Sequence, residues 1–168
     1  IIENGKVVIP APKSQGSYHP TKSAFGMSAD NVPSIEWVYS VGSENKTYSY
    51  PTPNPLTTNG SPTPAPTDTR PEGAAPWNPN YAIGAGPRLV HKGVKTVAAA
   101  VEMRGADDDT REPRSAIGYM PDGRVVFLVV EGRNPGISMG ATFNDLAEIF
   151  LNIGCVEAMN LDGGGSTG

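Results

Sequence analysis

The sequence of 168 residues contains a single cysteine, no long apolar run and no cluster of basic residues. Cys155 cannot form a disulfide within the chain, and its apolar neighbours favour a buried thiol over a catalytic one. No stretch approaches the roughly 20 apolar residues that a membrane-spanning helix needs. The formal net charge is −4, whereas a nucleic-acid-binding protein shows a basic patch. These absences argue against a membrane span and against a nucleic-acid partner.

Proline is abundant but unevenly distributed. The chain has 17 prolines, and more than half of them fall between residues 50 and 80, where few apolar residues are available for a core. This composition predicts a long surface loop. A linker or a partner-binding polyproline segment is the alternative. The length of the chain fits one domain, so we expect a single domain over residues 1–168 with this loop inserted at about 50–80.

Several β-strands are indicated before and after the loop. Asn4-Gly5 between two β-branched runs is a strong hairpin signal, and three more apolar runs lie between turn formers. A further hairpin is predicted after the loop, with its turn at residues 91–93. The strand predictions cover residues 1–9, 24–27, 35–41, 46–50, 82–90 and 93–101. The segments 22–26 and 114–118 also resemble each other, as two related hairpin units would.

The last third of the chain has the clearest pattern. Residues 124–131 form a continuous apolar run, typical of a central strand that is covered on both faces. A helix is predicted from Thr142 to Gly154, and residues 155–161 indicate a second buried strand. We therefore expect a parallel strand-helix-strand unit. The predicted fold class is α+β or mixed α/β, with largely antiparallel hairpins joined to this C-terminal unit.

Two carboxylates follow the predicted parallel strands, Glu131 after the first and Asp162 after the second. The carboxyl ends of parallel strands lie at one edge of a sheet, where ligands of α/β proteins bind. A pair of carboxylates is the usual equipment for hydrolysis of a glycosidic bond. The alternative is two solvated acids at strand ends.

The residues after Asp162 are suited to an anion. The glycines of the run 163–166 allow backbone N–H groups to approach a phosphate closely, although such a run is also typical of a flexible turn. No lysine follows as in a nucleotide-binding P-loop. Arg114 and Arg133 offer forked cationic donors for a phosphate; for Arg133, an ion pair with a nearby acid is the alternative. The acids at 107–109 lack the glycine and glutamate positions of an EF-hand, so no metal site is predicted.

At these residues the sequence closely resembles the phosphodiester glycosidase family. Four blocks carry the resemblance in the family's order: residues 82–87, 113–118, 129–133 and 160–166. The resemblance implies a hydrolase that cleaves sugar-1-phosphodiester bonds in glycans or exopolysaccharide outside the cytoplasm. It also implies an incomplete domain that lacks flanking segments found in the family. In one departure, Glu131 stands where the family commonly has Asp.

The resemblance further implies roles for individual residues in one concave pocket. Arg114 and the glycine backbone would hold the phosphate, while Asp162 acts as nucleophile or general base with Glu131 assisting. Substrate-binding residues would be Arg133, Asn160, Gly163, Gly164, Gly165 and Ser166. No cofactor is implied, and a homo-oligomer is left open. The rival hypothesis is a non-catalytic glycan-binding module on the same fold, with Trp37, Trp77 or Tyr81 stacking on sugars.

Overall fold

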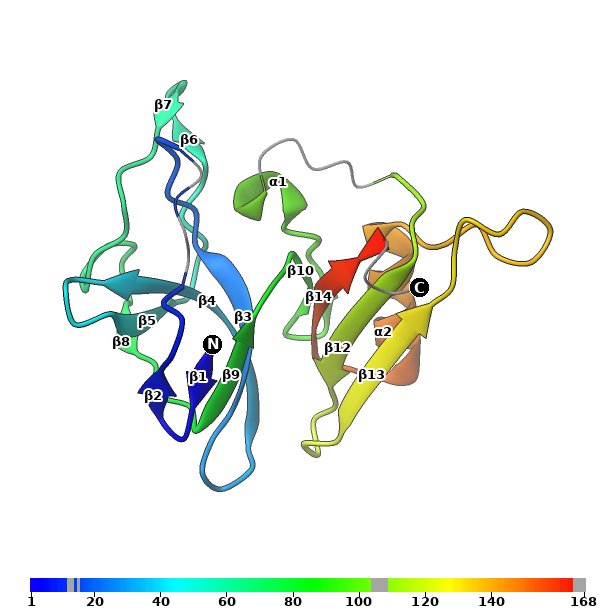
Figure 1. Ribbon diagram of the computed structural model, residues 1–168, viewed down its shortest axis with the longest axis horizontal. Coiled ribbons are helices and arrows are strands. Elements are labelled where there is room, and N and C mark those ends of the chain that lie inside the picture. Colours follow the sequence, from blue (N-terminus) through cyan, green and yellow to red (C-terminus); the bar gives the residue numbers. More distant parts are fainter. Residues whose placement is uncertain (12–13, 15, 104–108, 165–168) are drawn as a thin grey trace. The chain divides into compact units, whose positions relative to one another are not determined.

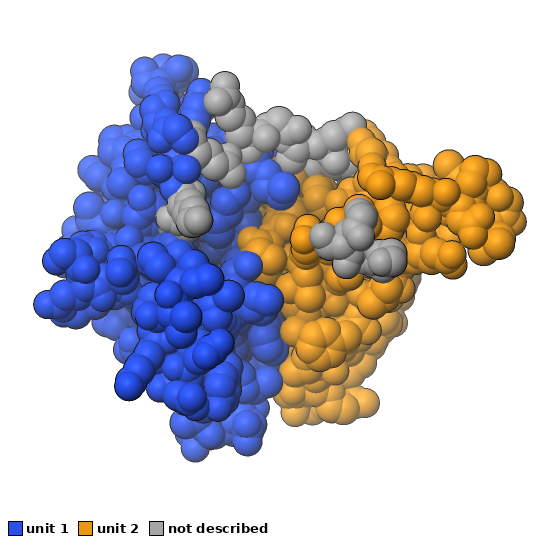
Figure 2. Space-filling model, in the orientation of Figure 1, with its two compact units in different colours: residues 1–84, 100–105 blue, residues 85–99, 106–168 orange. Residues whose placement is uncertain are grey.

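The computed structural model describes residues 1–11, 14, 16–103 and 109–164. The chain divides into two compact units, which Figure 2 shows in different colours. Unit 1 comprises Ile1–Gly84 with Ala100–Gly105, and unit 2 comprises Ala85–Ala99 with Ala106–Gly168. Each unit is built on its own antiparallel sheet (Figure 1). Neither helix in the described part of the chain has the length and apolar character that a membrane crossing requires.

Unit 1 contains a seven-stranded sheet in the order β2-β1-β9-β3-β4-β5-β8. Its strands are β1 (Ile2–Glu3), β2 (Lys6–Val7), β3 (Lys22–Met27), β4 (Pro33–Val41), β5 (Lys46–Tyr50), β8 (Ala75–Pro76) and β9 (Tyr81–Gly84). The predicted N-terminal hairpin is confirmed, since β1 pairs antiparallel with β2. Asn4 and Gly5 take φ values of +51° and +71° between the two strands, the left-handed conformations that a tight two-residue hairpin turn requires.

The core of unit 1 includes a buried charge at the short helix α1 (Ala99–Glu102). Glu102 is fully buried, and its carboxylate accepts hydrogen bonds from Ser23 N (2.9 Å), Ser23 Oγ (2.8 Å) and Trp37 Nε1 (2.8 Å). A buried carboxylate is stable only when such donors compensate it. The indole of Trp37 is therefore a core group that is 4% exposed, and the idea that it stacks on a sugar is wrong.

The proline-rich segment has little regular structure, as predicted. It contains the short exposed hairpin of β6 (Thr57–Thr58) and β7 (Ser61–Pro62), and then β8, which pairs with β5 at the sheet edge. Asn54 anchors the segment, because it is 3% exposed and its Nδ2 donates to His19 O (2.8 Å) and Pro64 O (3.2 Å).

Unit 2 contains a five-stranded sheet in the order β11-β10-β14-β12-β13. Its elements are β10 (Arg88–His91), β11 (Val94–Lys95), β12 (Arg114–Tyr119), β13 (Val125–Val130), the helix α2 (Phe143–Ile153) and β14 (Glu157–Gly163). The predicted hairpin after the loop is confirmed only for β10 and β11, because residues 81–84 belong to the sheet of unit 1 and residues 99–102 are helical.

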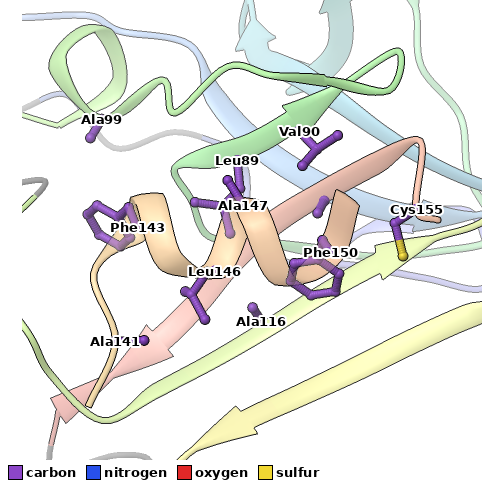
Figure 3. Close-up of a cluster of buried hydrophobic side chains, with 11 residues drawn as sticks. Leu89, Val90, Ala99, Ala116, Ala141, Phe143, Leu146, Ala147, Phe150 and Cys155 are labelled. Atoms are coloured by element: carbon purple, nitrogen blue, oxygen red, sulfur yellow. The ribbon is translucent and has the colours of Figure 1, made fainter. Parts of the chain in front are cut away.

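The predicted helix is confirmed. Thr142 Oγ1 accepts from Asp145 N (3.0 Å), and Asp145 Oδ2 accepts from Thr142 N (2.9 Å), which completes a capping box. Gly154 ends the helix at a φ of +96°, where glycine carries no steric penalty. Figure 3 shows the side chains of Leu146 and Phe150 among the buried residues of unit 2, so α2 covers one face of the sheet.

The predicted parallel strand-helix-strand unit is wrong, and so is the α+β or mixed α/β fold class. β13 and β14 run in the same direction in one sheet, but they do not pair with each other, because β12 lies between them and is antiparallel to both. No two strands in the described ranges pair in parallel, so the fold is predominantly antiparallel β. The turn at residues 120–124 brings β12 and β13 together as a local hairpin, a partner that the apolar run itself does not reveal.

The predicted central position of residues 124–131 is also wrong. β13 is the edge strand of its sheet, and its residues Phe127 and Val129 are 72% and 66% exposed. The strand is apolar on both faces, but only the face towards α2 is packed: Val126, Leu128 and Val130 contact the core cluster. The cysteine prediction holds, since Cys155 is 2% exposed and burial raises the pKa of its thiol.

Candidate functional site

The start of β12 and the ends of β13 and β14 lie together, at one end of these three strands in the sheet of unit 2. Arg114, the first residue of β12, is in register with Val130 at the end of β13 and with Gly163 at the end of β14. Because β12 is antiparallel to both neighbours, β13 and β14 end on either side of Arg114. Strands lie about 4.8 Å apart, so the two ends are separated by about 10 Å.

Arg114 is held firmly on the face of the sheet that α2 covers. Its side chain lies over the ring of Phe143, 4.2 Å from the centroid, and the residue is 9% exposed. Nε donates to Ala141 O (3.1 Å) and Nη2 donates to Thr110 O (3.1 Å). Burial lowers the pKa of Arg114, and the negative charge of Glu112 opposes that shift. A guanidinium is protonated in proteins even so, so this edge carries a fixed positive charge.

Each of two consecutive glycines lies beside a guanidinium. A Cβ on Gly163 would be 3.8 Å from Arg114 Nη1 and 3.0 Å from the carbonyl oxygen of Pro113. A Cβ on Gly164 would be 3.6 Å from Arg133 Nη2, and Gly164 has a φ of +64°. Only glycine takes that conformation without strain. Gly164 N donates to Pro113 O (2.9 Å), which fixes the glycines against the start of β12.

Arg133 has an acidic partner that the sequence analysis missed. Its Nε and Nη2 both donate to Glu112 Oε2, each at 2.7 Å. The ion-pair interpretation of Arg133 therefore holds, with Glu112 as its partner and not the neighbouring Glu131. Glu112 is anchored by a bridge to Ala141, through Glu112 N to Ala141 O (3.3 Å) and Ala141 N to Glu112 O (3.0 Å). In the sequence, Glu112 is marked only by its position directly before Pro113, which is not a distinctive pattern.

The two predicted acids flank Arg114 from different strands. Asp162 is exposed on β14, and its Oδ1 accepts from Gly163 N (2.9 Å). Glu131 is exposed directly after β13, and its Oε1 accepts from Asn134 Nδ2 (3.4 Å) within the following loop. Because β13 and β14 end on either side of Arg114, both acids lie at the same end of these strands. That they line one concave pocket stays a prediction.

Asn160 lies two residues before Asp162 and is 4% exposed. It is opposite Ala116, whose side chain belongs to the core under α2. Its Nδ2 donates to Gly86 O (3.2 Å) and to Leu161 O. Its Oδ1 is buried and, among the described residues, has no hydrogen-bond partner. The remaining predicted site residues, Gly165 and Ser166, lie outside the described part of the chain.

A second polar cluster lies at the other end of β14. Glu157 accepts from Arg88 Nε (3.0 Å) and Lys92 N (3.0 Å), and it lies 2.9 Å from His91 Nδ1. Burial lowers the pKa of His91, and the positive charge of Arg88 lowers it further. Six residues of strand, about 20 Å, separate Glu157 from Gly163, so this cluster is distinct from the candidate site. In the described ranges, no three His, Cys, Asp or Glu side chains group as metal ligands.

Comparison with known proteins adds the family. The sequence model of the phosphodiester glycosidase family matches residues 1–168. The chain belongs to the phosphodiester glycosidase family. It is 45% identical over 62 residues to the SPbeta prophage-derived protein YomE of Bacillus subtilis, a match that covers 37% of this chain and 10% of YomE.

One solved structure of a phosphodiester glycosidase is similar to this chain in fold. The zebrafish N-acetylglucosamine-1-phosphodiester alpha-N-acetylglucosaminidase catalytic domain, auto-inhibited by its pro-peptide, superposes with a TM-score of 0.54 at 17% identity. That match covers 87% of this chain and 41% of the zebrafish chain. A protein from Synechocystis matches with a TM-score of 0.47 at 20% identity, over 88% of this chain and 37% of its own. The chain thus spans less than half the length of these relatives.

Proposed function

We propose that this chain is part of a glycosidase that hydrolyses sugar-1-phosphodiester bonds in glycans or exopolysaccharide outside the cytoplasm. One observation carries the proposal: the guanidinium groups of Arg114 and Arg133 lie beside the backbone of Gly163 and Gly164. The guanidinium forks supply charged donors for a phosphate, and the glycines, which have no side chains, leave room for it to approach. The two units would then be one partial glycosidase domain.

The proposed chemistry follows from where the charges lie. Cleavage of the bond between the anomeric carbon and the phosphate oxygen leaves the bonding electron pair on the phosphate, and water supplies the hydroxyl to the sugar. The departing phosphate needs stabilisation of its charge, which Arg114 supplies. Asp162 serves as nucleophile or general base, and Glu131 assists.

Asn160 has a natural role in this scheme. Its Oδ1 is buried without a partner among the described residues, and such an acceptor costs free energy unless a ligand or water bonds to it. A sugar hydroxyl that donates to Oδ1 when substrate binds would satisfy it. Asn160 is therefore proposed as a substrate-binding residue, together with Arg133 and the glycines.

A non-catalytic glycan-binding module is the second candidate, and Trp77 favours it. Trp77 lines two surface hollows of unit 1, of about 330 Å³ and 270 Å³, and a partly exposed indole offers a face for sugar stacking. Tyr81, which is 50% exposed, donates to Asn4 Oδ1 at 2.7 Å. Neither residue belongs to the sheet that carries Arg114.

Turnover of a chromogenic sugar-1-phosphodiester by the complete protein separates the two candidates. The glycosidase proposal predicts release of the chromogenic phosphate with saturation kinetics, and it predicts loss of that release in Arg114→Ala. Binding of the substrate without any turnover, together with loss of binding in Trp77→Ala, would favour the binding module and contradict the proposal.

A further inference from the structure

The proposed phosphate site contains a negatively charged side chain, that of Glu112. Glu112 Oε2 receives both Nε and Nη2 of Arg133 at 2.7 Å, and the Glu112 charge also acts on Arg114. Arg114, Arg133 and Glu112 together carry a net charge of +1, and Asp162 and Glu131, which lie at the same strand ends, add two further negative charges. A phosphodiester carries a single negative charge, whereas a phosphomonoester carries about −1.5 to −2 near pH 7.

Glu112 is fixed in place. Its backbone is paired with Ala141 on both sides of the bridge, and a Cβ on Gly140 would lie 2.4 Å from Glu112 backbone atoms. The backbone is therefore tightly packed, and the Glu112 side chain is only 26% exposed. A second negative charge on a ligand would therefore be repelled by this carboxylate, whose backbone cannot shift to relieve the repulsion.

We propose that Glu112 shifts the preference of the site away from a doubly charged phosphomonoester and towards a singly charged phosphodiester. This inference rests on the proposed function, because hydrolysis of a sugar-1-phosphodiester converts the first kind of anion into the second. Glu112 then weakens the binding of the phosphate product and favours its release. Glu112 does not touch the reacting atoms in this account: it sets the charge of the site through Arg133.

Coulomb's law gives the size of the effect. Two unit charges roughly 6 Å apart change an equilibrium constant by about three-fold at the dielectric of bulk water and by about a hundred-fold at the value of about 20 that is typical near a protein surface. We therefore take about five-fold as a low value for these partly exposed groups. Each negative charge on the ligand contributes this factor once. Removing the charge of Glu112 should therefore tighten binding of a monoanion by about five-fold and that of a dianion by about 25-fold.

The test uses two small probes of nearly the same size. Dimethyl phosphate carries one negative charge, and methyl phosphate carries two at pH 8. Their affinities for the complete protein are measured by calorimetry, without any need for turnover. Glu112→Gln keeps an oxygen that accepts from Arg133 and removes only the charge. We expect the ratio of the methyl phosphate Kd to the dimethyl phosphate Kd to fall about five-fold in this variant.

Two further variants control for other effects. Glu112→Asp keeps the charge and should retain a ratio close to that of the unaltered protein. Asp122→Asn removes the carboxylate that pairs with Arg124 at 2.7 Å, at the turn that joins β12 to β13 and at the far end of both strands from Arg114. It should leave both affinities unchanged, and its thermal unfolding provides the reference for the folding of Glu112→Gln.

The outcomes divide cleanly. An unchanged ratio in Glu112→Gln, weaker binding of both probes, or no binding of either probe to any variant would overturn the proposal. Weaker binding of both would mean that Glu112 only orients Arg133. A protein that shows the expected ratio but does not hydrolyse the chromogenic substrate keeps the charge selectivity and loses the proposed hydrolysis, so the two failures are distinguishable.

Discussion

Arg114→Lys should weaken phosphate binding and also destabilise unit 2. The guanidinium of Arg114 performs three tasks with different atoms: Nε and Nη2 bond to the carbonyls of Ala141 and Thr110, and Nη1 lies towards Gly163. A lysine ammonium is a compact point charge that cannot reach all three positions. The substitution keeps the charge and removes the geometry.

The magnitude follows from the contacts that are lost. Ala141 O keeps its bond from Glu112 N and Thr110 is exposed, so the cost comes from the lost hydrogen bonds to a charged group, about 1.5–3 kcal/mol. The weaker contact with the Phe143 ring adds about 0.5–1 kcal/mol. We expect the free energy of unfolding to fall by about 2–4 kcal/mol. The lost donor to phosphate is a charge-assisted hydrogen bond of about 1.5–3 kcal/mol, so phosphate affinity should fall about ten- to a hundred-fold.

Two assays separate these effects. Urea unfolding measures stability, and calorimetric titration with dimethyl phosphate measures the anion site under conditions where the variant is folded. Arg124→Lys is the matched control, because the Arg124 side chain is 73% exposed and pairs with Asp122 at the surface. It should change stability by less than about 1 kcal/mol. A folded Arg114→Lys protein that binds dimethyl phosphate within two-fold of the unaltered protein would refute the role given to Nη1.

Two further predictions concern stability, each read from urea unfolding. Glu157→Gln should destabilise the protein by about 3–5 kcal/mol, because it leaves the buried guanidinium of Arg88 without its counter-charge. The control Glu148→Gln breaks an exposed ion pair with Lys95 and should cost less than about 1 kcal/mol. Equal costs for the two variants would contradict this prediction. Gly26→Ala should cost about 1–3 kcal/mol, since its methyl would lie 2.5 Å from Trp77 Cζ2. Gly84→Ala meets nothing within 4 Å, and a similar loss in both would show that packing against the indole is not the cause.

Elements that depend on nearby residues were predictable from the sequence. The helix α2 was predicted because Thr142 and Asp145 complete a capping box and Gly154 ends the helix at positive φ, all within 13 residues. The hairpin at Asn4-Gly5 depends on two residues that adopt left-handed conformations readily. Local chemistry decides both elements before any tertiary contact forms.

Strand partners were not predictable in the same way. The apolar run at residues 124–131 predicted a strand, but its place in the sheet depends on how β12 pairs with both β13 and β14 and on which face receives α2. β12 lies between β13 and β14, where Gly118 allows close packing: a Cβ there would lie 2.9 Å from Phe150 Cδ1. The order of the strands cannot be predicted from a pattern of apolar residues, because strand order depends on contacts between distant parts of the chain.

The candidate site shows the same division. The glycines, the two arginines and the acids were proposed from residue types suited to phosphate and glycosidic chemistry, and their roles stay predictions. Glu112 was missed because an acid before Pro113 has no distinctive pattern. It was noticed only through its ion pair with Arg133, which lies 21 residues further along the chain.

The central claim is that Asp162 and the neighbouring phosphate site hydrolyse a sugar-1-phosphodiester. The most direct test is the kcat of the complete Asp162→Asn protein on a chromogenic sugar-1-phosphodiester, with substrate affinity measured on the same sample. The substitution keeps the shape of the side chain and removes its charge, so we expect kcat to fall by at least about a hundred-fold while binding and folding are retained. Turnover close to that of the unaltered protein would contradict the account.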